Sequence, residues 1–446
     1  MMTDRLADLE SLPCKCEPGM DESFNYAGQV RLDTVSELEA DECVRPTHGM
    51  TGSRFEFTID PSSPTFVSLG SMTLTVTCKV VASDGASLTS TSSKPAFVNN
   101  IIASLWSSIE YRIHDTEINN QTFSHPGYKS VISSLLSYNE QGAKQLAAGG
   151  FAVEDGENND ATTDANEIFT GWTSKLKESG EVQLTGPLPI DLCAMDNFLA
   201  PGTKLDLILE PASQDFFLMC STASAKFKVK YSDMFLEYRR VSMPPTAASR
   251  IIDAGITGGG HRYIGPYTHV TAHEVPKGSS MAVVPLYPDG HPCPKHVIIG
   301  QVPTKNFFGS ISTNPYVFKH FKLNHLALRV NNVVTTNSEL TPDFEKHLYA
   351  REYSRLFTQT GKRGSTSQGV LISEKDFANN HTLFPFDLTP DECNSRHLHL
   401  GKQAKLDVEM RWAEALEDPI IVLVMATFDQ VMHIDNGTGK VKISLI

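Results

Sequence analysis

Apolar and polar residues alternate with a period of two along much of the chain. In residues 404–412 the even-numbered residues are apolar and the odd-numbered ones are charged. Successive side chains of a strand point to opposite faces, so this pattern predicts a strand with one buried and one solvated face. Residues 420–425 are apolar without interruption, which is typical of a strand buried on both faces. Related patterns predict further strands at 54–60, 71–80, 109–118, 181–184, 204–210, 267–275, 295–302, 322–330 and 428–434.

Two segments have helical spacing instead. In residues 128–138 the apolar side chains Val131, Ile132, Leu135 and Leu136 fall on one side of a helix. Residues 342–357 have the pattern of a second helix. Helices are therefore expected as insertions between strands.

Residues 226–238 contain a change of register within one strand. The apolar side chains are odd-numbered from Phe227 to Tyr231 and even-numbered from Met234 to Tyr238. A one-residue slip turns every later side chain to the opposite face of the sheet. One long strand with a β-bulge near Ser232–Asp233 explains the pattern.

The strands form two groups of similar length. We predict an acidic N-terminal arm at 1–50, a first jelly roll at 51–240, a linker at 241–250 and a second jelly roll at 251–446. Many short strands joined by turn-rich segments are typical of β-sandwiches, and 446 residues are enough for two of them. The expected fold class is all-β: two tandem jelly-roll sandwiches, a double jelly roll, with short helical insertions and long loops.

The net charge of −14 is concentrated in the first half, and residues 1–50 hold 4 Lys+Arg against 11 Asp+Glu. Nucleic-acid binding depends on neutralising phosphates, so we expect no direct binding of nucleic acid. Residues 142–167 are expected to form a long loop, solvated and mobile, because residues 154–167 carry six acidic side chains and no basic one. The longest apolar run, 419–426, has eight residues, so no membrane span is expected.

Several histidines are candidates for a metal site. They are His269 with His273, His397 with His399, and His291 and His296 on either side of Cys293. A zinc site needs three or four converging ligands, and no HExxH or paired-cysteine motif accompanies these residues. The favoured interpretation is surface or hydrogen-bonded histidines. The eight cysteines, which include no CxxC pair, are interpreted as reduced thiols of an intracellular chain.

The remaining motifs are weak. Residues 437–440 resemble the end of a phosphate-binding loop but lack its Ser or Thr, and Asp387 with Asp391 is better explained as turn chemistry than as a catalytic pair. Alternating lysines at 226, 228 and 230 indicate a solvated strand face. We therefore assign no catalytic, cofactor-binding or metal-binding residue. No enzyme activity and no cofactor are expected.

Three stretches of the second half resemble a known family. They are residues 308–324, residues 349–391 with the closing sequence Phe-Asp-Leu-Thr-Pro-Asp, and residues 401–435. In this order they are similar to the C-terminal jelly roll of the major capsid protein of Polinton-type viruses, a group that includes adintoviruses and adomaviruses. Residues 188–209 resemble part of the first roll of that family.

The resemblance implies a hexon-like structural protein of a DNA virus. Three chains with two rolls each would form a homotrimer, which is a pseudo-hexagonal capsomer, and capsomers would tile an icosahedral shell. The implied partners are neighbouring capsomers, penton proteins and cement proteins. The implied location is the virion, after assembly inside the host cell. Loops such as 142–167 would rise from the outer surface, and the acidic arm would join neighbouring capsomers or meet a cement protein from inside.

Two other functions are alternatives. A trimeric β-sandwich lectin or receptor-binding spike would present an aromatic groove, but Trp106, Trp172 and Trp412 are scattered along the chain. An enzyme on a cupin-like sandwich would use the His-Leu-His sequence at 397–399, but no Glu follows at short range.

Overall fold

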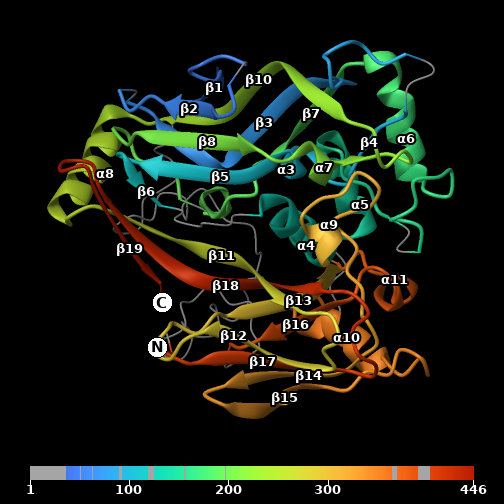
Figure 1. The fold of residues 1–446 in the computed structure, drawn as a ribbon. Coiled ribbons are helices and arrows are strands. Elements are labelled where there is room, and N and C mark those ends of the chain that lie inside the picture. The colour runs from blue at the N-terminus through green and yellow to red at the C-terminus, as the bar shows by residue number, and fades with distance from the viewer. Residues whose placement is uncertain are drawn as a thin grey trace.

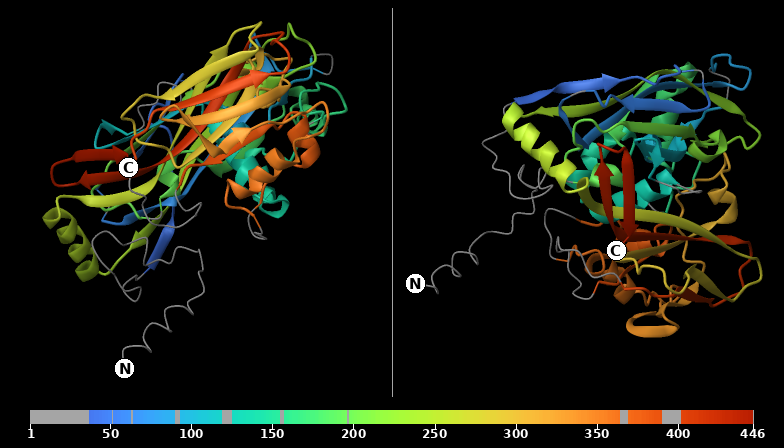
Figure 2. Two further views of the ribbon diagram at one scale, coloured as in Figure 1. Left: turned by 90° about the horizontal axis from the view of Figure 1, so that it is seen from below. Right: turned by 90° about the vertical axis from the view of Figure 1, so that its left-hand side faces the viewer.

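The computed structural model of the protein describes residues 37–50, 52–62, 64–89, 93–118, 125–154, 157–195, 197–363, 369–389 and 402–445. Two β-sandwiches lie one above the other (Figure 1). A helix, α8 (Pro245–Thr257), runs from the upper sandwich to the lower one at one side of the molecule (Figures 1 and 2). The two sandwiches are called roll one and roll two below.

Roll one has eight main strands in two four-stranded sheets. Its strands are β1 (Glu37–Val44), β2 (Phe55–Ile59), β3 (Phe66–Ala82), β4 (Ala96–Phe97), β5 (Trp106–Ile113), β6 (Thr116–Glu117), β7 (Val182–Pro187), β8 (Leu205–Pro211), β9 (Leu218–Met219) and β10 (Phe227–Ser242). The sheet orders are β1-β10-β3-β7 and β2-β8-β5-β6, and the short strands β4 and β9 pair separately. The main strands are those other than β4 and β9. When these eight are numbered from 1 to 8 along the chain, the two sheet orders become 1-8-3-6 and 2-7-4-5.

Roll two repeats this topology. Its strands are β11 (His261–Val275), β12 (Met281–Tyr287), β13 (His296–Pro303), β14 (Leu323–Val330), β15 (Val333–Leu340), β16 (Leu383–Asp387), β17 (Leu406–Trp412), β18 (Ile420–Asp435) and β19 (Lys440–Leu445). The orders β11-β18-β13-β16 and β12-β17-β14-β15 are again 1-8-3-6 and 2-7-4-5, and β19 is added beside β18. Eight antiparallel strands in this order form a jelly roll. The expected double jelly roll is confirmed.

Short helices fill the connections between strands, mainly at one end of the rolls (Figure 1). Besides α8 they are α3 (Ile101–Ser104), α4 (Pro126–Ser137), α5 (Glu140–Ala143), η2 (Lys144–Gly149), α6 (Glu167–Lys175), η3 (Lys177–Ser179), η4 (Asp191–Ala194), α7 (Gln214–Phe217), α9 (Thr304–Phe307), α10 (Ala350–Thr358) and α11 (Glu374–Ala378). The helix expected near 128–138 is α4. The helix expected at 342–357 begins only at Ala350. Within the described residues, no helix is both long and apolar enough to cross a membrane.

The two inner sheets are buried on both faces. All but one of the first fourteen residues of β18 are buried or half-buried, and the first five residues of β8 are buried without alternation. The reason is the layering in Figure 1: the sheets that contain β8 and β18 each have their own core on one side and the other roll on the other. One continuous hydrophobic cluster therefore includes residues of both rolls.

The structure confirms the β-bulge and corrects two strands. The register of β10 against β3 shifts between Tyr231 and Asp233, as the sequence predicts. The segment 109–118 is two strands instead of one, because His114 and Asp115 have φ angles of 48° and 65° and form a tight turn. The predicted solvated face of 404–412 is also wrong at two positions, because Asp407 and Glu409 are 5% and 2% exposed. The Lys405 ammonium lies 3.0 Å from Asp407, and Arg329 and Arg411 lie against the carboxylate of Glu409.

The strand pairing can be compared with the predicted boundaries of the arm, 1–50, and the linker, 241–250. β1 falls within the predicted arm, 1–50, and pairs with β10 as the first strand of roll one. The predicted linker, 241–250, contains the end of β10 and the first turns of α8. Roll one is therefore better delimited by β1 and β10, with α8 as the connection to roll two.

The turn between β14 and β15 provides a test of the fold. Asn331 and Asn332 have φ angles of 52° and 64°, in the left-handed region that a two-residue hairpin turn of type I′ requires. A β-branched residue is strained in that region, so Asn332→Val should lower the free energy of unfolding by about 1–2 kcal/mol. Asn332→Gly is the matched control and should change it by less than about 0.5 kcal/mol. Urea unfolding of both variants is the measurement; equal stabilities would contradict the assigned turn.

Candidate functional site

The contact between the two rolls is the most elaborate feature of the structure. At one end it is an aromatic cluster of Tyr128 and Phe216 from roll one with Phe307 and Tyr316 from roll two. The Tyr128 ring lies 5.7 Å from the Phe307 ring and 5.3 Å from the Tyr316 ring, measured between centroids. Tyr128 and Tyr316 have no exposed surface. Offset and edge-to-face pairs at these distances add to the apolar burial that holds the rolls together.

Both buried tyrosines have hydrogen-bond partners across the contact. The Tyr128 hydroxyl donates to the carbonyl oxygen of Pro315 at 3.0 Å, and the Tyr316 hydroxyl lies 2.5 Å from the Ser104 hydroxyl. Burial raises the pKa of both tyrosines well above the ordinary value, so both stay neutral. A buried hydroxyl without a partner is costly, so these bonds fix how the rolls face each other.

A glycine permits the close approach of the rolls. Gly127 lies in the first turn of α4, and a Cβ atom there would be 2.2 Å from the Tyr316 hydroxyl oxygen. The next nearest atoms, Ser104 Cα and Tyr316 Cζ, would be 3.4 Å away. The sequence gives no signal for this role, because Tyr316 is far from Gly127 along the chain.

Polar groups of the acidic loop bind roll two. The Asn314 backbone N–H donates to the Asp160 carboxylate at 2.7 Å, and the Asn314 side-chain amide donates to the Asn159 carbonyl at 2.9 Å. The Asn380 amide donates to the side-chain oxygen of Asn159 at 3.0 Å. Asn159 is 2% exposed. Buried amides in such a network restrict each other to one arrangement.

These contacts correct the expectation of a free loop at 142–167. Its first part is helical, as α5 and η2, and Glu154 is buried beside His381 of roll two, with 3.5 Å between Oε2 and Nε2. The described part of the segment is therefore a strap between the rolls. The acidic composition was misleading because the partners of Glu154, Asn159 and Asp160 in roll two lie more than 150 residues away.

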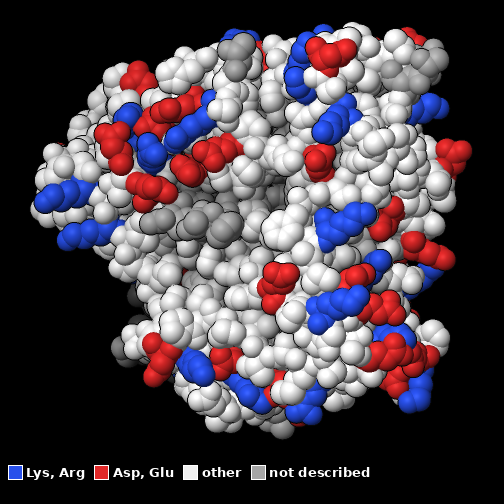
Figure 3. All heavy atoms as spheres, in the orientation of Figure 1, with Lys and Arg blue, Asp and Glu red and all other residues white. Residues whose placement is uncertain are grey.

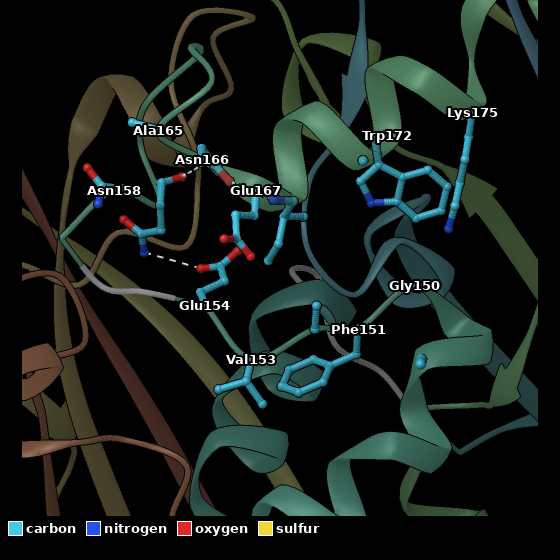
Figure 4. Close-up of a pocket in the computed structure, with 15 residues that line it drawn as sticks. Gly150, Phe151, Val153, Glu154, Asn158, Ala165, Asn166, Glu167, Trp172 and Lys175 are labelled. Atoms are coloured by element: carbon cyan, nitrogen blue, oxygen red, sulfur yellow. Dashed lines mark hydrogen bonds between the residues drawn. The ribbon is translucent and has the colours of Figure 1, made fainter.

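The same segment borders a cavity of about 580 Å³ between η2 and α6. Figure 4 shows Glu154 and Glu167 directed into it, with Phe151 and Val153 along its floor. Trp172 lines the far side, and the Lys175 ammonium lies 4.6 Å from the centre of the indole ring. The ammonium therefore covers one face of the only tryptophan in this lining.

Hydrogen bonds join the rolls elsewhere along the contact, one of them to a carboxylate held by a salt bridge of roll one. The Lys129 ammonium lies 2.6 Å from Asp191, whose second oxygen accepts the backbone N–H of Thr268 on β11 at 2.8 Å. Near the opposite end, the Asn436 amide donates to the Pro201 carbonyl at 2.9 Å. The contact is thus fixed at both ends, and none of these residues was identified from the sequence.

The candidate metal ligands are not brought together. The His291 ring stacks on Tyr287 at 4.5 Å, and the His273 ring nitrogen lies 3.1 Å from the Thr271 hydroxyl. His296 lies 3.6 Å from Asp387. In the ranges that the structure describes, no group of three or more His, Cys, Asp or Glu residues could hold a metal ion. His397 and His399 lie outside the described residues.

The other weak motifs are turns. Asp387 accepts hydrogen bonds from the backbone N–H of Thr389 at 2.9 Å and from its hydroxyl at 2.7 Å, which is the turn chemistry expected before a proline. Asp391 lies outside the described residues. Residues 437–439 lie in the turn between β18 and β19, where Asp435 accepts hydrogen bonds from the backbone N–H groups of Gly437 and Thr438, and Lys440 begins β19.

The three tryptophans and the face in Figure 3 give no support to a lectin groove or a nucleic-acid site. Trp106, Trp172 and Trp412 are 1%, 7% and 3% exposed, so all three belong to cores. On the face in Figure 3 the acidic and basic side chains of the described residues are interspersed, without one large basic patch. Sugar-binding sites need accessible aromatic faces, and phosphate binding needs clustered cations.

Comparisons with known proteins support the fold over the whole chain. No family model matches it. An uncharacterized protein of Caenorhabditis elegans, F54H12.2, is 21% identical over 403 residues, which are 85% of this chain and 91% of the relative. Among solved structures, a chain of the Sputnik virophage cryo-EM structure has a TM-score of 0.58 at 13% identity and covers 97% of this chain and 93% of its own.

Two further solved structures agree. A chain of the PBCV-1 virus capsid has a TM-score of 0.57 at 10% identity, with 94% of this chain and 99% of that chain covered. The Faustovirus major capsid protein has a TM-score of 0.54 at 9% identity, with 96% and 94% covered. The chain therefore has the double jelly-roll fold from its first described strand to its last.

The close approach at Gly127 gives a prediction about the inter-roll contact. Gly127→Ala should lower the free energy of unfolding by about 1–3 kcal/mol, because the added methyl group forces Tyr316 to move. In a Tyr316→Phe background the same substitution should cost less, because the nearest atom is removed. The control is Gly171→Ala in α6, where nothing lies within 4 Å and alanine should be neutral or stabilising. The stabilities of the two single variants, their combination and the control are measured by thermal unfolding at one fixed protein concentration. If Gly127→Ala lowers stability equally with Tyr316 and with Phe at position 316, the contact is refuted.

A half-buried histidine makes the same contact sensitive to acid. The His125 ring lies 5.0 Å from Phe307 of roll two, and burial lowers the pKa of His125 to about 4. Between this pKa and the unfolded value near 6.5, the unfolded chain binds the extra proton, so stability falls as the pH falls. We expect His125 to account for a loss of about 1–2 kcal/mol between pH 7.5 and 5.

The measurement is unfolding in urea at several pH values. His125→Asn should flatten the pH dependence between 7 and 4, and asparagine tolerates the positive φ of 37° at this position. The control is His433→Asn, which removes an exposed histidine of β18. An unchanged pH profile in His125→Asn would contradict the prediction.

Proposed function

We propose that the protein is a viral major capsid protein, a structural subunit without catalytic activity. The observation that carries this proposal is the serial repeat of one strand order, 1-8-3-6 with 2-7-4-5, in two rolls packed against each other. The virophage, PBCV-1 and Faustovirus structures that share the fold along their whole length support it. The resemblance of residues 308–435 to the Polinton-type family favours that virus group.

The assembly unit is a homotrimer with a pseudo-hexagonal outline. Within the chain, the 2-7-4-5 sheet of roll one packs toward the 1-8-3-6 sheet of roll two (Figure 1). The two sheets left on the outside are the 1-8-3-6 sheet of roll one and the 2-7-4-5 sheet of roll two. When the same kind of contact is repeated between chains, the outer sheet of roll two packs against the outer sheet of roll one in the next chain. Such a contact is heterologous and closes into a ring, here six rolls from three chains.

The outer sheet of roll two offers an apolar strip for this contact. Met281 and Val283 of β12 are 49% and 47% exposed, and Pro285 lies exposed on the same side of the strand. Next to them on β17 lie the charged residues Arg411 and Glu409. Apolar side chains in a row on a sheet face are typical of surfaces that another protein covers.

The outer sheet of roll one carries more polar side chains. Thr73, Thr75 and Thr77 follow one another along the outer face of β3, and Lys228 and Lys230 of β10 are exposed. Short side chains allow a second sheet to approach closely. The lysines complement the carboxylates of the outer sheet of roll two, of which Glu339 is half exposed.

Capsomers of this kind would tile an icosahedral shell in the virion after assembly inside the host cell. Neighbouring capsomers, penton proteins and cement proteins are the proposed partners. Direct binding of nucleic acid is not part of the proposal, because the chain carries a net charge of −14. The buried tryptophans disfavour a lectin or spike.

Light scattering and negative-stain microscopy of the purified chain test the proposal. A particle of three times 49.0 kDa with a hexagonal outline is the expected result. A trimer with another outline would favour a spike. A monomer that stays monomeric at high protein concentration would overturn the capsid function.

One substitution tests the proposed trimer contact. Met281→Glu should weaken trimerisation by at least roughly 30-fold, because a buried, unpaired carboxylate costs about 2 kcal/mol or more at an interface. The isolated fold should tolerate the change, because Arg411 lies opposite Met281 on β17 and is exposed. The matched control is Ile256→Glu on α8, which is 61% exposed and lies on neither outer sheet. Sedimentation velocity over a concentration series measures both; equal dissociation of the two variants would exclude this surface.

A further inference from the structure

The strand β19 has a free edge. It pairs with β18 from Lys440 to Leu445 and with no other strand in the described part of the chain. Unpaired N–H and C=O groups along an edge are a template for an additional strand. All six residues of β19 are exposed or half-exposed along a hairpin that extends beyond β13 and β16, as the red hairpin in Figure 2 shows.

The hydrophobic core is incompletely covered at this edge. Val441, Ile443 and Leu445 lie on one face of β19, opposite fully buried residues of β18: Ile443 pairs with Met432, and Val441 with Ile434. Ile443 is nevertheless 39% exposed. A further strand paired with the free edge of β19 would cover Ile443. Its own apolar side chains would lie beside Val441, Ile443 and Leu445.

The opposite face of β19 is basic. Lys440 and Lys442 are exposed, and among the described residues neither forms an ion pair within 4 Å. An added strand with carboxylates at its ends would complement both ammonium groups. The edge therefore fits an extended segment that is apolar on one side and acidic at its ends.

The chain itself contains one segment of this chemistry. Between 24 and 32 the even-numbered residues Phe24, Tyr26, Val30 and Leu32 are apolar, with Gly28 between them. This is the period-two pattern of a strand with one apolar face. Carboxylates flank it at Asp21, Glu22 and Asp33. The whole stretch 1–36 holds seven acidic and three basic residues, which opposes the charge of β19.

Residues 24–32 precede β1 by only a few residues, and the position of β1 favours pairing with β19 of another copy over pairing with β19 of the same chain. β1 begins at Glu37, paired with Ser242, next to the start of α8. The far end of α8 leads to β11, whose first residue, His261, pairs with Ile434 of β18 near the hairpin. The 13 residues of α8 span about 20 Å. The five steps from Leu32 to Glu37 span at most about 17 Å, so the segment hardly reaches along β19 of its own chain.

We propose that residues 24–32 of one chain add to the free edge of β19 in a neighbouring copy as a further strand. Phe24, Tyr26, Val30 and Leu32 then cover Ile443, and the flanking carboxylates lie near Lys440 and Lys442. This inference rests on the proposed function in one respect: copies of the chain must meet.

A site-specific cross-link tests the proposal in the full-length chain. A benzophenone side chain replaces Ile443, and isotope-labelled and unlabelled chains are mixed before assembly. Irradiation followed by mass spectrometry identifies the linked peptide. The expected product joins β19 to residues 24–32, with the two isotopes mixed. A product with both peptides from one chain, or a link to another segment, would overturn the proposal.

Reversing charges on β19 and then on the donor arm distinguishes a loss of binding between the two segments from a loss of folding. Lys440→Glu with Lys442→Glu should lower the cross-link yield roughly tenfold, and Asp21→Lys with Glu22→Lys on the donor arm should restore it. The control pair Lys144→Glu with Lys277→Glu changes exposed lysines elsewhere and should leave the yield unchanged. Yield lost in the control pair as well, or no rescue by the reversed arm, would also overturn the proposal.

The oligomeric state distinguishes this inference from the proposed function. A trimer of the expected outline without the cross-link would refute the strand exchange and leave the capsid proposal intact. A chain that forms no trimer would refute the capsid proposal, whatever the cross-link shows.

Discussion

The structure depends on the burial of two sheets against each other. The sheets that contain β8 and β18 have a core on each side, so neither roll is complete without the other. At about 25 cal/mol for each Å² of apolar surface, exposure of such a sheet face would remove much of the net stability of a domain. The aromatic cluster around Tyr128 and the missing side chain at Gly127 follow from this contact.

The contact also determines which polar groups can be buried. Asn159, Asn314 and Asn380 lie in a region that water hardly reaches, and each uses its amide in a hydrogen bond to the opposite roll. An amide left without a partner there would cost more than the bond gains. The acidic segment before α6 is therefore held in place by specific partners, although its composition favours water.

Two similar rolls packed in series leave two different outer faces. One carries threonines and lysines, and the other carries the apolar strip around Met281. Because the faces differ, a contact that pairs them between chains would join unlike surfaces, which is the geometry of the proposed ring. The hairpin of β18 and β19 belongs to neither outer sheet and has its own exposed edge.

The sequence by itself determined many of the strands, among them β10, β17 and β18, because the period of two records which side of each strand is buried. It predicted the β-bulge in β10 and the two-roll architecture, and it marked 420–425 as buried on both faces. Only the tertiary structure decided the roles of Glu409, Asn159 and Gly127, because their partners are distant along the chain and a local pattern carries no information about them. The physical reason is that periodicity reports burial on a face, whereas a salt bridge, an amide bond or a missing Cβ depends on which element packs against that face.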